Sequence, residues 1–111
     1  NTRLKKPRII WTQKEYLLES NMLDTLNNLI QLIRQRKEKP MEGSYTNKLL
    51  KDNSLSKSKV LEEINELINA VEKNTNKIHE SADVFYHLFV YLEANDIKIE
   101  DVMDELKKRR G

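Results

Sequence analysis

The segment from Glu80 to Leu92, ESADVFYHLFVYL, limits the fold more than any other part of this 111-residue sequence. Read as a helix, its stretch from Val84 onward is apolar around nearly the whole circumference, with His87 as the one strongly polar side chain. A helix of this kind is buried between neighbours instead of lying on a surface. The sequence therefore predicts a central helix that other helices of the same domain surround.

The remaining segments predict helices as well. Apolar residues recur at helical spacing from Gln13 to Lys39, and Pro40 ends that run. Further helices are expected at residues 45–52, 57–73, 77–94 and 100–110, with Ser44 as the N-cap of the first of these. The connections are short, which places consecutive helices antiparallel. We therefore predict an all-α, antiparallel bundle of four to five helices.

Composition excludes several classes of protein. The chain has no cysteine, so disulfides, thiolate metal sites and cysteine nucleophiles are ruled out, and a reducing, cytoplasmic setting is expected. No apolar run approaches the ~20 residues that cross a bilayer. The net charge of +2 is too small to indicate a phosphate-backbone binder. We expect neither a membrane nor a nucleic acid as partner.

Two groups of carboxylates lie close to apolar side chains in the predicted helices. The helix expected at residues 57–73 carries one group on a single side, Glu62, Glu63 and Glu66. The central helix carries a narrow polar stripe of Glu80, Asp83 and His87. Carboxylates kept from water without partners raise their pKa and take up protons. A stripe of this kind on a buried helix therefore requires a compensating charge.

An antiparallel hairpin of these two helices would bring the two groups together. Equal rise on both sides of the turn sets Glu66 level with Asp83, and Glu62 level with His87. The facing carboxylates then repel one another, and Mg²⁺, which prefers oxygen ligands, relieves the repulsion. We predict a Mg²⁺ site formed by Glu62, Glu63, Glu66, Glu80 and Asp83. The alternative is a solvated acidic face with surface Glu–Lys pairs.

These residues resemble a known family. The pattern EExxE followed by ExxD is similar to the metal-binding signature of the MazG-like all-α nucleotide pyrophosphatases. Longer segments resemble one branch of them, the phosphoribosyl-ATP pyrophosphatases of histidine biosynthesis: EGSYTNKLL from Glu42, KVLEEINE from Lys59, ESADVFYHLFVYL from Glu80 and the tail IKIEDVMDELKKRRG. The resemblance covers roughly residues 22–111. Leu61 stands where the family has glycine.

The resemblance implies hydrolysis of the α–β phosphoanhydride of phosphoribosyl-ATP to phosphoribosyl-AMP and pyrophosphate. It implies Mg²⁺ as cofactor and either Glu63 or Glu66 as the group that takes the proton of the attacking water. The residues expected to bind the substrate are Ser44, Tyr45, Thr46, Lys48 and Lys59. For two of them a second interpretation stays open, N-capping by Ser44 and an ion pair between Lys59 and Glu63.

Further expectations concern assembly. Residues 1–20 are predicted to be a basic arm or linker, with Ile9, Ile10 and Trp11 as its apolar cluster, ahead of a domain at 21–111. The family resemblance implies that the domain is fused to, or works with, a phosphoribosyl-AMP cyclohydrolase. The central helix has more apolar surface than its short neighbours cover, so we predict a homodimer. The interface is expected to include Phe85, Phe89 and Tyr91.

Two other functions remain open from the sequence. The first is a related enzyme that removes free nucleoside triphosphates with the same carboxylates, although the segment GSYT argues against it. The second is a helical dimerisation module without catalytic activity, in which the carboxylates are solvated.

Overall fold

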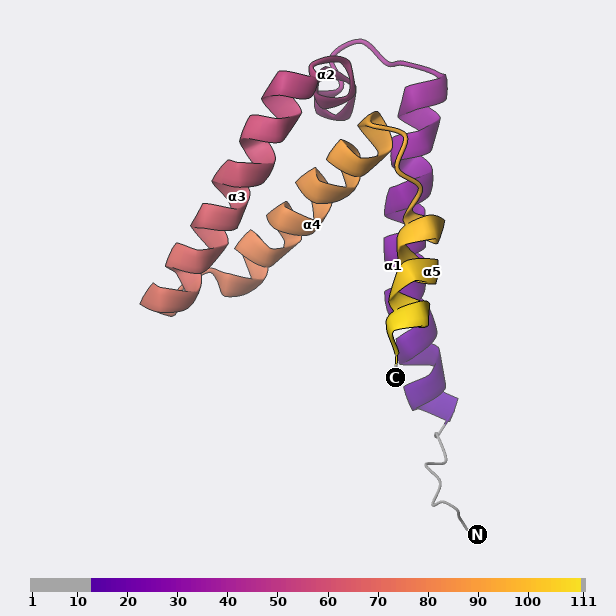
Figure 1. The fold of residues 1–111 in the computed structure, drawn as a ribbon. Coiled ribbons are helices and arrows are strands. Elements are labelled where there is room, and N and C mark those ends of the chain that lie inside the picture. The colour runs from indigo at the N-terminus through magenta and orange to yellow at the C-terminus, as the bar shows by residue number, and fades with distance from the viewer. Residues whose placement is uncertain (1–12, 111) are drawn as a thin grey trace, which may run out of the picture.

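The computed structural model describes the backbone of residues 13–110 and the side chains of residues 23–110. This part of the chain forms five α-helices and no strand: α1 (Gln13–Glu38), α2 (Tyr45–Lys51), α3 (Asn53–Lys73), α4 (Lys77–Ala94) and α5 (Ile99–Arg109). The predicted all-α fold is confirmed. The apolar cluster expected at residues 9–11 lies outside the described residues. Figure 1 shows α3 and α4 as an antiparallel hairpin, with α2 between the start of α3 and the end of α1.

Local capping explains where the middle helices begin and end. Ser44 has extended backbone, and its Oγ accepts a hydrogen bond from the backbone N–H three residues on, as expected of an N-cap. Asp52 acts in the same way for α3, where its carboxylate accepts from the N–H of Leu55. The start of α3 predicted at residue 57 was wrong because this cap was overlooked. Asn74 ends α3 in the left-handed conformation that commonly stops a helix.

A small apolar core lies where α1, α2 and α4 meet. Ile33, Leu49 and Val90 have no exposed surface, and Tyr86 and Phe89 pack against them. The central position predicted for α4 is confirmed, because α4 contacts each of the other four helices. Its contact with α3 is the most extensive contact between helices in the described part of the chain. None of the described helices is long and apolar enough to cross a membrane.

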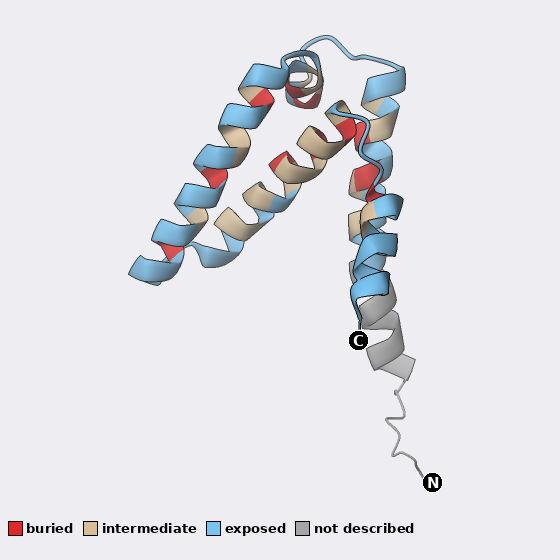
Figure 2. Cartoon of the chain, in the orientation of Figure 1, coloured by how far each residue is buried: buried red, intermediate tan, exposed pale blue. Residues whose placement is uncertain are grey.

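The helix α3 buries one carboxylate, Glu63, and leaves much of its apolar side exposed. Its buried positions are Ser56, Glu63 and Ala70. The apolar residues on the rest of its surface are exposed, and we refer to them as the outer apolar face: Leu61, Ile64, Ile68 and Val71. Figure 2 shows α3 pale blue along most of its length, with red patches on the side toward α4. Burial of carboxylate in place of leucine and isoleucine is unfavourable unless the carboxylate has a partner.

Candidate metal centre

Three carboxylates of α3 converge at the hairpin. One oxygen from each lies within 4.8 Å of one oxygen from each of the others. The members of this group are Glu62, Glu63 and Glu66. Glu63 lies toward α4 and is 6 % exposed, whereas the other two are exposed to solvent. This α3 group therefore presents several like charges along one side of the seam.

A second group lies on α4. His79, Glu80 and Asp83 each offer one ligand atom within 4.8 Å of the others, and Glu80 and Asp83 are half-buried. The two groups approach each other through Glu66 and Glu80, which line one pocket of about 190 Å³ at the closed end of the hairpin. The negative charge of Glu63 raises the pKa of Glu66, and partial loss of hydration and the charge of Glu80 add to the effect. We call Glu62, Glu63, Glu66, Glu80 and Asp83 the acid seam.

The acid seam is short of partners. Oε1 of Glu63 and Oε1 of Glu80 are buried and accept no hydrogen bond. Lys59 is the only lysine or arginine among the described residues that pairs with the seam, at 3.1 Å from Glu62 and 3.4 Å from Glu63. Buried carboxylate oxygens without donors are costly. Oxygen donors in such a group are the ligands that Mg²⁺ prefers, so these residues fit a divalent cation.

A histidine connects the seam to the start of α2. His87 Nδ1 lies 2.8 Å from the carbonyl oxygen of Asp83, and Nε2 lies 3.0 Å from the hydroxyl of Tyr45. A carbonyl only accepts, so Nδ1 carries a proton, and Nε2 shares a hydrogen bond with the Tyr45 hydroxyl. Burial raises the pKa of Tyr45, the nearby Lys59 opposes the increase, and Glu63 adds to it. Tyr45 therefore lies within electrostatic reach of the seam.

The residues predicted to bind substrate divide into three sets. Tyr45 and Lys59 lie beside the acid seam. Lys48 is exposed and lines, with Ser44 and Tyr45, a pocket of about 740 Å³. The hydroxyls of Ser44 and Thr46 are occupied, since Ser44 caps α2 and buried Thr46 bonds to the hydroxyl of Tyr86. The ion pair that was the second interpretation of Lys59 is present, at 3.4 Å from Glu63. Its position beside the carboxylates is also compatible with the first interpretation, contact with substrate phosphate.

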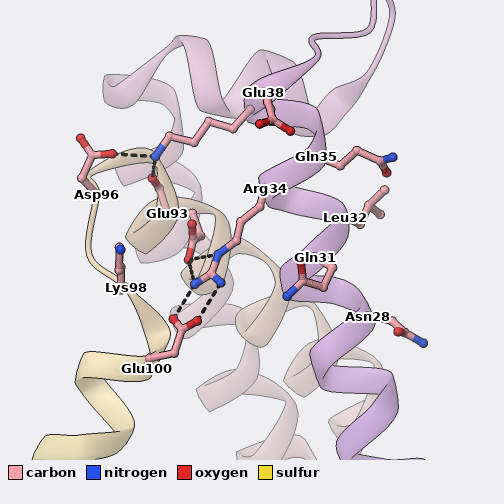
Figure 3. A pocket seen from close by; sticks show the side chains of 11 residues that line it. Asn28, Gln31, Leu32, Arg34, Gln35, Glu38, Glu93, Asp96, Lys98 and Glu100 are labelled. Atoms are coloured by element: carbon pink, nitrogen blue, oxygen red, sulfur yellow. Dashed lines mark hydrogen bonds and ion pairs between the residues drawn. The ribbon is translucent and has the colours of Figure 1, made fainter.

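A second charged cluster, which the sequence reasoning missed, surrounds a larger pocket of about 760 Å³ (Figure 3). Arg34 of α1 donates to Glu93 at 2.9 Å and to Glu100 at 2.6 Å, and Lys37 pairs with Asp96 at 2.6 Å. The hydrogen bond from Arg34 lowers the pKa of Glu100 to about 2. These pairs tie α1 to the end of α4 and the start of α5. Their charges already have partners, so the larger pocket is a weaker candidate for chemistry than the seam.

Among the described residues, no cation of the last turn of α5 forms an ion pair with the acid seam. Arg109 pairs with Glu105, four residues earlier on α5. The last turn of α5 carries three cations, Lys107, Lys108 and Arg109. Their positive charges interact favourably with the negative end of the helix dipole.

Comparison with known proteins adds independent evidence. Residues 26–110 match the family model described as phosphoribosyl-ATP pyrophosphohydrolase. The phosphoribosyl-ATP pyrophosphatase of Bacillus mycoides is 42 % identical over 93 residues, which cover 81 % of this chain and 87 % of the relative. The histidine biosynthesis bifunctional protein HisIE of Pyrococcus furiosus is 43 % identical over 91 residues, but the match spans only 42 % of its length.

A third relative extends the range of organisms. The phosphoribosyl-ATP pyrophosphatase of Methanococcoides burtonii is 39 % identical over 94 residues, with 79 % of this chain and 94 % of the relative covered. The matched region contains the acid seam, Tyr45 and His87. The chain belongs to the phosphoribosyl-ATP pyrophosphohydrolase family.

Proposed function

We propose that this chain hydrolyses the α–β phosphoanhydride of phosphoribosyl-ATP in histidine biosynthesis, releasing phosphoribosyl-AMP and pyrophosphate. Family membership supports the reaction. The observation that carries the proposal is the pair of buried, unpartnered oxygens, Oε1 of Glu63 and Oε1 of Glu80. Structural carboxylates normally have donors, so this pair favours a site prepared for a cation and its phosphate ligands over a solvated acidic face.

The acid seam would hold Mg²⁺, with Glu62, Glu63, Glu66 and Asp83 as ligands and Glu80 as a ligand or its support. When bound, the ion would neutralise phosphate charge and lower the pKa of the attacking water. The carboxylates would hold the ion between α3 and α4, because without it they would repel the phosphates of the substrate. Glu63 and Glu66 are both candidates for the proton acceptor.

The cationic and aromatic residues beside the seam would bind the rest of the substrate. Lys59 lies at the edge of the seam and offers a positive charge to phosphate oxygens. Tyr45 and Lys48 reach the neighbouring pocket of about 740 Å³. Ser44 and Thr46 would act by fixing this segment, because their hydroxyls are engaged with α2 and with Tyr86.

A homodimer would cover the outer apolar face. Besides that face, Phe85 is 57 % exposed, while Phe89 and Tyr91 are half-buried, so of the expected interface residues Phe85 is the most available. Light scattering at micromolar concentration is expected to give twice the chain mass. Ile68→Asp, which places a charge in the outer apolar face, should shift the protein toward monomer. A monomeric wild-type chain would contradict the proposal.

The names of two relatives suggest the setting in which the enzyme acts. Two of them are bifunctional histidine-biosynthesis proteins, from Pyrococcus furiosus and from the chloroplast of Arabidopsis thaliana. We propose that this domain is likewise fused to, or works with, a phosphoribosyl-AMP cyclohydrolase, in the cytoplasm. Residues 1–20 would then serve as an arm or linker before the domain at 21–111, a boundary that falls within α1.

The decisive experiment compares pyrophosphate release from phosphoribosyl-ATP, ATP and deoxynucleoside triphosphates, each with and without Mg²⁺. Preference for phosphoribosyl-ATP is expected. Faster release from the ordinary nucleotides would indicate the triphosphate-removing enzyme, and no release from any of them would indicate a dimerisation module. Asp83→Ala should abolish release while the circular dichroism spectrum stays helical. Unchanged activity in this variant would contradict the role of the seam.

A further inference from the structure

Tyr45 combines an exposed ring with a hydroxyl that is fixed inside the protein. Tyr45 is 45 % exposed, yet its hydroxyl is hydrogen-bonded to Nε2 of His87, a residue that is only 6 % exposed. His87 is held in turn by the carbonyl of Asp83. The polar end of Tyr45 therefore has its partner, and an aromatic surface remains open to solvent.

The ring of Tyr45 is also supported on one side. It stacks on Tyr86 with centroids 6.3 Å apart and planes inclined by 19°, and it meets His87 edge-on at 5.8 Å. Tyr86 is anchored by the hydrogen bond between its hydroxyl and Thr46. A ring held in this way loses little conformational freedom when a ligand binds its open surface.

Tyr45 is near both the acid seam and a cavity. Its hydroxyl is within electrostatic reach of Lys59 and Glu63, and Tyr45 is among the residues that line the pocket of about 740 Å³, as is Lys48. In a nucleotide the base is one ribose away from the first phosphate. Phosphates bound at the seam would therefore bring a base near Tyr45, and aromatic side chains stack on any nucleobase.

We infer that Tyr45 binds the purine ring of the substrate by stacking, and that His87 and Tyr86 position Tyr45 for this contact. The inference rests on the proposed function, because it assumes that the substrate is a nucleotide with its phosphates at the seam. It assigns His87 a positioning role, through the hydroxyl of Tyr45, and not a role as metal ligand.

Calorimetric titration with two ligands tests this assignment. ADP carries a purine, whereas inorganic tripolyphosphate carries only phosphates, so the second ligand is the matched control. In the presence of Mg²⁺, Tyr45→Leu is expected to weaken ADP binding by at least about fivefold, the lower end of measured base stacking. Tripolyphosphate binding should change less than about twofold. Tyr45→Phe, which keeps the ring but loses the bond to His87, should fall between wild type and Tyr45→Leu for ADP.

Other outcomes would overturn the inference. Equal weakening of both ligands by Tyr45→Leu would mean that Tyr45 supports the phosphate site, and unchanged ADP binding would mean that the purine lies elsewhere. Thermal melts of both variants establish that they are folded. Because binding is measured without turnover, failure here leaves pyrophosphate release by the wild-type protein as a separate test of the proposed function.

Discussion

The two clusters of carboxylates in this protein differ in how their charge is compensated. Around Arg34, Glu93 and Glu100 share a guanidinium, and Asp96 pairs with Lys37. Along the hairpin of α3 and α4, Lys59 pairs with carboxylates of α3 only, and the buried oxygens of Glu63 and Glu80 have no donor. The first arrangement is complete within the protein and stabilises the fold. The second is incomplete, which indicates a site that a ligand completes.

The difference also shows in the direction of the pKa shifts. Hydrogen bonds from Arg34 lower the pKa of Glu100, whereas the charge of Glu63 raises the pKa of Glu66. In the cluster around Arg34 and Lys37, the paired cations favour the ionised forms of Glu100 and Asp96. In the seam the charge of Glu63 opposes ionisation of Glu66, so removal of Glu66 and removal of Glu100 should have opposite consequences.

The largest expected effect is on catalysis at the seam. Glu63→Gln, which preserves shape but removes the charge, should lower the rate of pyrophosphate release by about a thousandfold, within the range for a lost ligand or base. Glu72→Gln is the matched control, because Glu72 lies on the same helix and is exposed. Equal rates for the two variants would contradict the assignment of Glu63.

The next effect concerns stability at the paired cluster. Arg34→Met leaves the carboxylate of Glu93, which is 7 % exposed, without its cation. The free energy of unfolding should fall by roughly 3 kcal/mol, as for other buried carboxylates that lose a partner. Urea titration at fixed protein concentration measures the loss. A change below about 1 kcal/mol would mean that the network contributes little, as at many surface ion pairs.

The smallest effects are expected in the pH dependence of unfolding without divalent ions. Glu100 has a pKa of about 2 in the folded protein against an ordinary 4.5, so its stabilisation is present above 4.5 and is lost as the pH falls toward 2. The pKa of Glu66 is raised, so this carboxylate reduces stability as the pH rises from its ordinary pKa through its folded one.

The two glutamine variants should therefore behave oppositely near neutral pH. Glu100→Gln should lower the urea midpoint there, and Glu66→Gln should raise it. Both differences should shrink in strong acid, where the carboxyl groups are protonated in the folded and unfolded chain. Midpoints that shift in the same direction would remove the distinction between the clusters.

Local patterns in the sequence were sufficient for most of the fold. Helical spacing up to Pro40, the cap at Ser44 and the apolar run from Val84 to Leu92 each depend on neighbouring residues, and the elements they predict are confirmed. The start of α3 was misplaced because Asp52 both ends α2 and caps α3. A residue that serves two helices leaves no separate loop to recognise.

Contacts between residues far apart in the sequence could not be predicted from local patterns. The two acidic groups could be placed on one hairpin because a single turn connects their helices, and in the structure Glu66 and Glu80 line the same pocket. Arg34 lies 59 residues from Glu93 and 66 from Glu100, and Tyr45 lies 42 residues from His87. No local periodicity links such pairs, and their alignment depends on how α1 and α2 pack on α4.

The central claim is that the acid seam is completed by a cation. It is tested most directly by titrating the substrate-free protein with Mg²⁺, with binding measured by calorimetry and stability by thermal melting. If the acid seam lacks a cation, wild-type protein should bind Mg²⁺ and gain about 2.7 kcal/mol of stability at a hundredfold excess over Kd. Glu63→Gln should lose most of this gain, while Arg34→Met should keep it. Stabilisation of wild type by Mg²⁺ that is no greater than that by NaCl of equal ionic strength would contradict the account.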